Sequence, residues 1–187
     1  TEMSSEDVRE ALTRSDVLLL PVGATEAHGG HLPLGTDTFE AREICRRSAL
    51  KLAEIGCPVV IGPVIPFGTS SFHMGFPGTI TLTSETLIRL LKEVCLSLYA
   101  TGFRKFAFVH GHDGSLPSMM VAAQDVVDAT PDAQVMCLNW LTPLSKVYHT
   151  IQTSKKGEGH GGEGETSRLL VTHPEITHPE RGIPHHL

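Results

Sequence analysis

The chain has 187 residues, with 15 Lys and Arg against 21 Asp and Glu, so its formal net charge is −6. This acidic balance argues against nucleic acid as a partner, because phosphate binding requires a basic face. No apolar run approaches the roughly 20 residues that a membrane span needs. We therefore expect one globular domain over residues 1–187, located in the cytoplasm. The four cysteines show no CxxC pairing, which also suits a reducing compartment.

Helical and apolar segments alternate along the first part of the chain. Serines followed by two acidic residues predict a short helix over residues 5–12. The apolar run Val17–Val22 predicts a buried strand, and a loop rich in glycine and histidine follows over residues 23–36. Apolar residues at helical spacing then predict a helix over residues 38–55, which Gly56 ends.

The second part of the chain continues this alternation. Ser84 is predicted to cap a helix that runs to Tyr99, with Glu85 in its first turn. The remaining predicted elements are a strand over 58–61, a long loop over 62–79, a strand over 105–109, a helix over 117–129, a strand over 134–138 and a helix over 165–170. Strand–helix alternation of this kind predicts an α/β fold with a mostly parallel sheet covered on both faces.

Ionisable side chains follow three of the predicted strands. Glu26 and His28 come shortly after the first strand, His73 lies in the loop after the second, and His110 and His112 follow the third. In open α/β sheets, ligands bind at the carboxyl ends of the strands, which meet at one edge. We therefore expect these side chains to form one site there.

The residues after the first and third strands are typical of metal ligands. Glu26, His28 and Asp37 offer two carboxylates and an imidazole, which zinc and manganese take in hydrolytic sites. A polar surface loop is the alternative interpretation. His112 is a further candidate ligand, and His110 is either a ligand or a hydrogen-bonding support.

The glycine-rich segment near the C-terminus carries three more candidates. His160, flanked by glycines, suits a proton shuttle, and Glu163 is a second candidate catalytic residue. Glu165 is either a metal ligand or a carboxylate that stabilises a helix N-terminus. A flexible linker is the alternative for this segment. We also predict that Asp113 binds substrate, and that His73 binds substrate or belongs to a structural corner that shapes the pocket.

Four motifs resemble those of the creatininase (creatinine amidohydrolase) family and cover most of the chain. In order they are PVGATEAHGGHLPLGTD from Pro21, SFHMGFPGT from Ser71, Gly111-His112, and HGGEGETS from His160. The resemblance implies a three-layer α/β/α sandwich that holds two divalent metal ions, Zn or Mn with Fe also possible. It implies a homo-oligomer, a hexamer, which hydrolyses a C–N bond of a small-molecule substrate.

Residue by residue, the resemblance implies a shared ligand set. Glu26 and His112 bind one metal, His28 binds the other, and Asp37 bridges them. Creatininase has a glutamate two residues past the His112 equivalent, where this chain has Gly114. Our candidate for the missing ligand is Glu165.

These residues predict a divalent-metal-dependent amidohydrolase acting on a small cyclic amide, a formamide or a related substrate. A metal-bridging hydroxide would attack the substrate, and His160 would protonate the leaving nitrogen. One alternative is hydrolysis of a non-amide ring, a lactone or a keto-sugar, on the same scaffold. Another is a non-catalytic metal-binding protein. The stretch between Leu138 and His160 is short for the family, which indicates either a trimmed pocket or residues missing there.

Overall fold

Four parallel strands form the sheet of the computed structural model, which describes residues 2–154 and 159–183. They are β1 (Val17–Val22), β2 (Val60–Ile61), β3 (Lys105–His110) and β4 (Gln134–Leu138), arranged in the order β2-β1-β3-β4. Leu18 of β1 pairs with Val60 on one side and with Phe106 on the other. The parallel sheet is as predicted, although β2 comprises only the last two residues of its predicted range.

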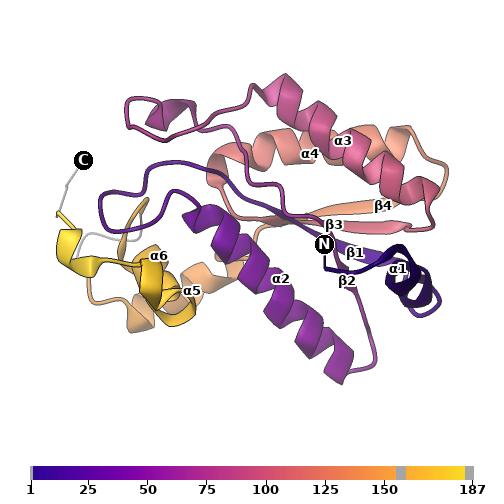
Figure 1. The fold of residues 1–187 in the computed structure, drawn as a ribbon, viewed down its shortest axis with the longest axis horizontal. Helices are drawn as coiled ribbons and strands as arrows, with labels where there is room; N and C mark the ends of the chain where they lie inside the picture. Colours follow the sequence, from indigo (N-terminus) through magenta and orange to yellow (C-terminus); the bar gives the residue numbers. More distant parts are fainter. Residues whose placement is uncertain (1, 155–158, 184–187) are drawn as a thin grey trace.

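Helices cover both faces of this sheet, so the predicted three-layer α/β/α architecture is confirmed (Figure 1). One layer contains α3 (Ser84–Ala100) and α4 (Leu116–Asp128), and the opposite layer contains α2 (Thr36–Glu54). The other helices are α1 (Ser5–Leu12), α5 (Leu141–Ile151) and α6 (Glu163–Thr172), and the short 3-10 turns are η1 (Ser71–His73), η2 (Asp113–Ser115), η3 (Pro174–Ile176) and η4 (Pro179–Arg181). Among the described helices, none is both long enough and apolar enough to cross a membrane.

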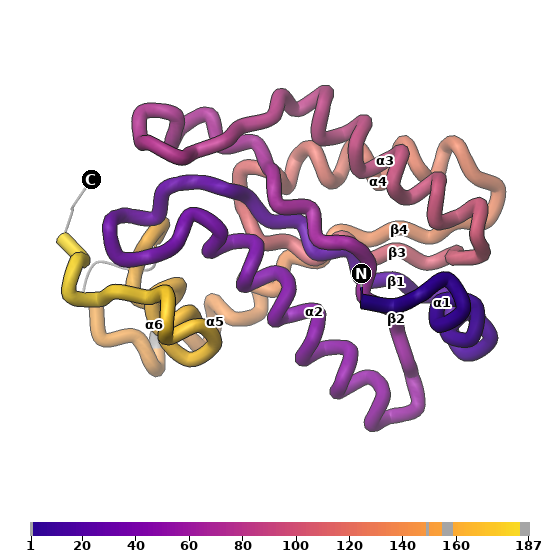
Figure 2. The backbone as a smooth tube through the Cα atoms, in the orientation of Figure 1, coloured from indigo at the N-terminus to yellow at the C-terminus, as the bar shows by residue number. Residues whose placement is uncertain are grey.

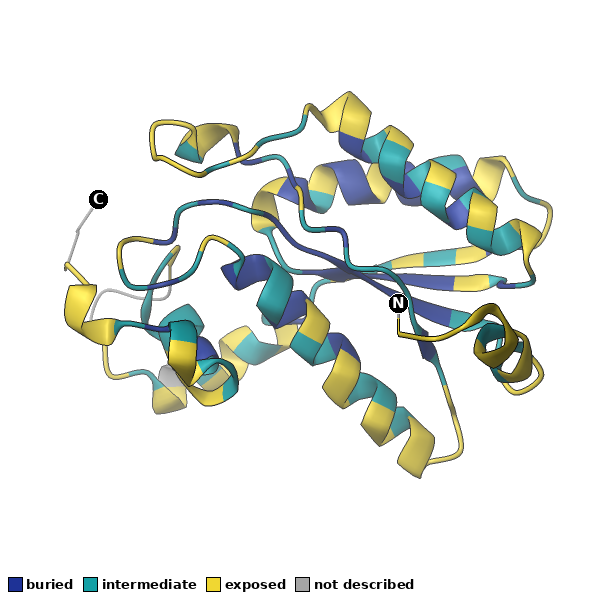
Figure 3. Ribbon diagram, viewed as in Figure 1, coloured by how far each residue is buried: buried dark blue, intermediate teal, exposed yellow. Residues whose placement is uncertain are grey.

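The larger apolar core lies between the sheet and the α3–α4 layer. Leu18, Leu20 and Val22 point from β1 into this layer, and Leu87 and Leu91 of α3 are fully buried. Figure 3 shows buried residues on the inner sides of α3 and α4 and exposed residues on their outer sides. Removing this apolar area from water is the main contribution that orders the sheet.

Several helix boundaries differ from the predictions in ways that matter locally. Helix α2 begins at Thr36, so Asp37 lies in its first turn, where the helix dipole favours a negative charge. The cap of α3 is Thr83, whose hydroxyl accepts the Thr86 N–H, so the assignment of Ser84 as the cap was wrong. Helix α5 was not predicted, although Leu141, Leu144, Tyr148 and Ile151 recur at helical spacing along it.

Two long loops lie side by side beyond the carboxyl ends of β1 and β2 (Figure 2). The Gly23 N–H donates to the Ile65 carbonyl at 2.9 Å, and the Ile80 N–H donates to the Thr25 carbonyl at 2.9 Å. These bonds fix the loop after β1 against the loop that carries η1. The loops can therefore present their side chains at defined positions relative to the sheet edge.

Candidate metal centre

Glu26, His28 and Asp37 form a buried cluster at the carboxyl end of β1. Glu26 and His28 are fully buried, and Asp37 is 2% exposed. His28 Nε2 lies 3.0 Å from Asp37 Oδ1 and 4.0 Å from Glu26 Oε1. Two carboxylates and an imidazole thus converge in an interior where uncompensated charge is costly.

The orientation of the His28 ring is fixed by a hydrogen bond to the backbone two residues earlier. His28 Nδ1 lies 3.1 Å from the Glu26 carbonyl, which can only accept, so Nδ1 carries the proton and donates. In neutral His28, Nε2 therefore presents a lone pair to Asp37. Two facing lone pairs require a cation between them, either a proton or a metal ion. Burial opposes protonation, but the hydrogen bond with Asp37 raises the pKa of His28 to about 9.

His112 reaches the same carboxylates from the turn after β3. Its Nε2–H donates to the Thr69 carbonyl at 3.0 Å, so Nδ1 is the nitrogen that faces the cluster. Nδ1 lies 3.2 Å from Glu26 Oε1 and 3.3 Å from Asp37 Oδ2. Burial again opposes protonation, but Asp37 and Glu26 raise the pKa of His112 to about 10. A histidine held by a carbonyl on one nitrogen, with the other turned inward, is typical of a metal ligand.

Carboxylate oxygens in this cluster lack aligned hydrogen-bond donors. Both oxygens of Glu26 and Oδ2 of Asp37 are buried without a well-aligned hydrogen bond among the described residues, although His112 Nδ1 lies 3.2 Å from Glu26 Oε1 and 3.3 Å from Asp37 Oδ2. Buried acceptors without donors are rare in folded proteins, unless an ion or a water satisfies them. The donor set of carboxylate oxygens and imidazole nitrogens is therefore chemically suited to a divalent cation such as zinc or manganese.

His160 and His73 complete a stack of histidines over the cluster. The His160 ring centroid lies 4.1 Å from that of His28 and 4.0 Å from that of His73. His160 Nε2–H donates to the Ala27 carbonyl at 2.5 Å, and its Nδ1 lies 3.5 Å from Glu26 Oε1. Burial, together with the neighbouring His28, lowers the pKa of His160. Its geometry therefore allows either proton transfer or metal binding at Nδ1.

Glu165 approaches the cluster from the first turn of α6. Its Oε2 accepts the Gly161 N–H at 2.6 Å and lies 3.9 Å from His28 Nε2. Burial raises the pKa of Glu165 to about 8, although the charge of His28 opposes this shift. Atoms of His28, His160 and Glu165 lie within 4.8 Å of one another, as do those of Glu26, His28 and Asp37. Two neighbouring groups of ligand atoms thus share His28.

Gly114 has little room for a side chain. A Cβ there would lie 2.6 Å from His112 Nε2 and 2.6 Å from the Thr69 carbonyl oxygen. Any side chain at this position would displace the ring or the backbone that orients it. This crowding is the physical reason that a carboxylate cannot be placed at Gly114 without rearranging His112.

His31 joins two segments of this centre. Its Nε2 lies 3.1 Å from the Gly161 carbonyl and 3.1 Å from Thr166 Oγ1. Its own carbonyl accepts the His178 N–H at 2.8 Å. His31 therefore holds the loop after β1 against the segment that carries His160 and Glu165.

Three predicted or open residues have other partners in the structure. The Glu163 carboxylate accepts the N–H groups of Thr153 and Ser154 at 2.9 and 2.6 Å, and these bonds lower its pKa. Asp113, with a side chain 81% exposed, lies 2.9 Å from Nε2 of the buried His110. The catalytic role of Glu163 and the substrate-binding role of Asp113 therefore stay predictions, without contact to the cluster among the interactions described.

One buried ion pair near the centre was not predicted. Arg168 Nε donates to Glu40 Oε1 at 2.8 Å, and Nη2 donates to Oε2 at 3.2 Å. These residues are 128 positions apart, so no local motif joins them. The available signal was the spacing of Glu40 from Asp37 and of Arg168 from Glu165, three residues in each case.

Comparison with known proteins agrees with this geometry. A family model described as creatininase, creatinine amidohydrolase, matches residues 1–186. The chain is 32% identical over 191 residues to the 3-dehydro-scyllo-inosose hydrolase of Thermotoga maritima, with 97% of this chain and 58% of that protein covered. It is 31% identical over 185 residues to the mycofactocin precursor peptide peptidase of Mycobacterium tuberculosis, with 96% and 68% covered. A structure described as creatininase with Mn gives a TM-score of 0.87 at 23% identity, with 99% of this chain and 76% of that chain covered.

The fold and the site define an α/β protein with a candidate metal centre at the carboxyl edge of a parallel sheet. The chain belongs to the creatininase family, because the family model matches nearly its whole length. The resemblance found in the four sequence motifs is thereby confirmed. The chain spans 58% of the length of the Thermotoga maritima relative.

Proposed function

We propose that this chain is a divalent-metal-dependent hydrolase that holds two ions. The observation that carries the proposal is the orientation of three histidines. His28, His112 and His160 each donate one ring N–H to a backbone carbonyl and turn the other nitrogen toward the carboxylates. The proposed ligands are Glu26, His28, Asp37, His112 and Glu165. Zinc and manganese fit this mixed donor set, and iron is also compatible with it.

We propose separate roles for three side chains of the centre, Asp37, His160 and His73. When bound, the ions would supply a water whose pKa is lowered toward neutrality. Asp37 lies between His28 and His112, which suits a carboxylate shared by two ions. Nδ1 of His160 lies 3.5 Å from Glu26 Oε1, and we propose that this atom takes a proton from the attacking water and then delivers it to the leaving group. His73, stacked on His160, is the proposed substrate contact.

We propose a C–N bond of a small cyclic amide, a formamide or a related substrate as the bond that is hydrolysed. The match to the creatinine amidohydrolase family model supports this class. The 32% identity to a 3-dehydro-scyllo-inosose hydrolase supports a second candidate, hydrolysis of a keto-sugar ring on the same scaffold. Both candidates use the same activated water, so only the pocket distinguishes them.

A substrate panel with defined metal content tests the proposal. The purified protein would be stripped with a chelator, reloaded separately with Zn²⁺ and Mn²⁺, and assayed against cyclic amides, formamides, lactones and keto-sugars. We expect about two ions per chain and turnover that depends on them. A protein that binds ions yet hydrolyses none of these classes would favour the non-catalytic alternative. A protein that binds no ion would contradict the proposal outright.

We further propose a cytoplasmic homo-oligomer, with a hexamer as the expected state. Membership of the creatininase family supports this proposal. Light scattering coupled to size-exclusion chromatography measures the mass of the assembly directly. A monomeric mass of 20.2 kDa would contradict it.

A further inference from the structure

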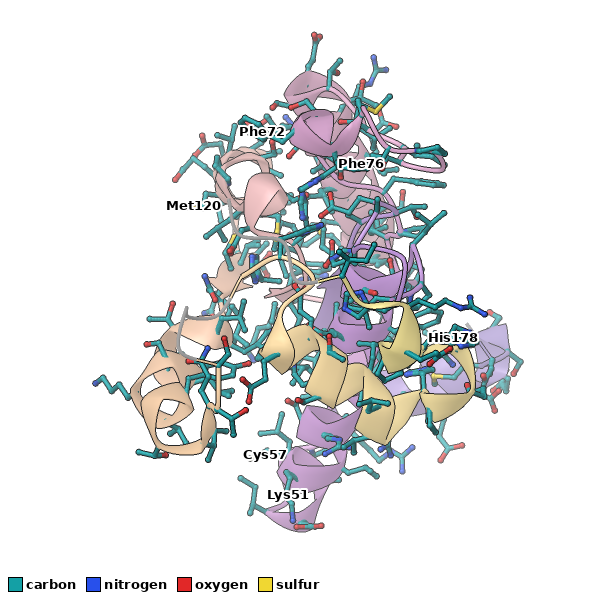
Figure 4. The ribbon with its side chains drawn as sticks, turned by 90° about the vertical axis from the view of Figure 1, so that its left-hand side faces the viewer. Lys51, Cys57, Phe72, Phe76, Met120 and His178 are labelled. Carbon is teal, nitrogen blue, oxygen red and sulfur yellow. The ribbon has the colours of Figure 1, made fainter. Side chains whose placement is uncertain are left out.

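Two helices meet beside the candidate metal centre with matched pairs of charged residues. Helix α2 carries Asp37 and Glu40, and α6 carries Glu165 and Arg168, and the members of each pair are three positions apart in the sequence. Residues at this spacing lie on the same side of a helix, one turn apart. Figures 1 and 4 both show α6 beside the N-terminal half of α2. One turn of each helix thus faces the cluster, and the next turn joins the two helices.

We propose that the Glu40–Arg168 ion pair is a positioning element that holds Glu165 in the metal centre. The inference rests on the proposed function, because it presupposes that Glu165 is a metal ligand. Glu40 and Arg168 do not themselves bind the ions. Glu40 and Arg168 act through the helix backbone on Glu165. They are positioning residues and not catalytic ones.

The geometry of the pair is suited to fixing one helix against another. Its two parallel hydrogen bonds, of 2.8 and 3.2 Å, engage both carboxylate oxygens of Glu40. A planar guanidinium paired in this way restricts rotation as well as distance, which a single contact does not. The guanidinium carbon also lies 5.2 Å from the centre of the Trp140 ring, so its plane is supported from a third segment.

Burial makes the pair strongly interdependent. The Glu40 side chain is 5% exposed and that of Arg168 is 23% exposed. Burial raises the pKa of Glu40 to about 7 even beside Arg168, so loss of Arg168 would leave the carboxylate to take up a proton, and the two hydrogen bonds that join the helices would be lost. The position of α6 on α2 therefore depends on both members.

The hydrogen bond of the Glu165 carboxylate lies within its own segment, which His31 also joins to the loop after β1, and the Glu40–Arg168 pair adds the contact that fixes α6 against α2. The Glu165 carboxylate accepts the N–H of Gly161, which belongs to the loop just before α6. Gly161 has φ of +67°, a conformation that favours glycine, so this loop is shaped by its own backbone. Glu165 Oε2 lies 3.9 Å from His28 Nε2. Metal–ligand bonds of about 2 Å tolerate little displacement of either side chain. A small rotation of α6 would remove the carboxylate from the shared ligand set.

Metal binding measured with Zn²⁺ alone tests the inference without any substrate. The variants are Arg168→Met, Arg168→Lys and Glu40→Gln, with ion stoichiometry from elemental analysis and affinity from chelator competition. Replacing the ions with Co²⁺ adds a visible spectrum that reports ligand number and geometry. The matched control is Glu43→Gln, since Glu43 lies on the same helix and is also paired with a fork of two bonds, to Arg46 at 2.7 Å.

We expect Arg168→Met and Glu40→Gln to lower the affinity for one of the two ions about 10- to 100-fold, as loss of an orienting partner does elsewhere. Both variants should also change the Co²⁺ spectrum. The other ion should keep its affinity. Arg168→Lys keeps the charge without the fork and should fall between wild type and Arg168→Met. Glu43→Gln should match wild type.

Different outcomes separate failure of this inference from failure of the proposed function. If the wild-type protein binds no Zn²⁺, the proposed function fails, and this inference fails with it. If wild type binds two ions and the variants bind both with unchanged affinity and spectrum, only the positioning role is overturned. If Arg168→Met does not fold, the ion affinities of the conservative Arg168→Lys and Glu40→Gln variants decide whether the pair positions Glu165. Equal loss of both ions with a cooperative loss of helical structure would assign the pair to general stability instead.

Discussion

The two faces of the sheet are packed with different kinds of side chain. Between the sheet and the α3–α4 layer lies the larger apolar cluster, which includes Leu91, Phe106 and Phe108. On the α2 side the apolar cluster is small and consists of Leu19, Cys45, Ala107, Val109 and Trp140. Beside it, α2 buries charged groups, Asp37 and Glu40, close to the imidazoles of the candidate centre.

This difference indicates that one face of the sheet mainly stabilises the fold and that the other face carries the groups for metal binding. Apolar burial stabilises the fold with no requirement for particular partners. Buried charges add little to stability and need partners of defined geometry. We therefore expect substitutions under α3 and α4 to change the free energy of unfolding, and substitutions under α2 to change metal binding and turnover.

Asp37→Ala should have the largest effect, because Asp37 contacts both His28 and His112. We expect loss of both ions and of turnover, measured by elemental analysis and by the substrate panel. The matched control is Asp125→Ala, an acidic residue on α4 whose side chain is 41% exposed. Two bound ions and full turnover in Asp37→Ala would contradict the assignment of metal binding to the α2 side of the sheet.

His160→Ala should retain both ions and lower turnover about 10²- to 10⁴-fold, the usual contribution of a positioned acid–base group. Its pKa is lowered by burial, so the wild-type side chain is neutral and available at neutral pH. The pH profile of kcat should lose one limb in the variant. His178→Ala, which removes a histidine paired with Glu180, serves as the control. Loss of an ion would instead identify His160 as a ligand.

Leu91→Ala tests the apolar face. Leu91 is fully buried in α3, and its truncation should reduce the free energy of unfolding by about 2–5 kcal/mol, measured by urea titration. Ion stoichiometry at saturating Zn²⁺ should not change. Val121→Ala on α4, where the side chain is 49% exposed, should have little effect on either quantity. A selective loss of metal from Leu91→Ala would show that the two faces are not independent.

Gly114→Ala should have the smallest effect that is still measurable. The added Cβ would lie 2.6 Å from the Thr69 carbonyl oxygen, which orients His112, so the ring must shift. We expect an ion affinity about tenfold weaker, as for other disturbed orienting contacts, with the fold intact by circular dichroism. Gly75→Ala is the control, since a Cβ there meets nothing within 4 Å. Unchanged affinity would mean that a side chain at position 114 is accommodated.

Much of the fold was predictable because its signals are local. Apolar runs such as Val17–Val22 and helical spacing in Ser84–Ala100 depend on residues close together in the chain, and these elements formed near their predicted ranges. Helix α5 was missed although Leu141, Leu144, Tyr148 and Ile151 recur at helical spacing, so the signal for this helix was local as well. Family membership was also accessible from the sequence, since its motifs are contiguous strings.

The sequence by itself determined which side chains are available to the centre and which strand ends deliver them. Only the tertiary structure decided how they are oriented. The nitrogen that His112 turns inward depends on the carbonyl of Thr69, and the one that His160 turns inward depends on the carbonyl of Ala27. The pairing of Glu40 with Arg168 likewise joins residues 128 positions apart. Such contacts arise from the packing of distant segments, so the spacing within each helix indicates which residues share a face but not which faces meet.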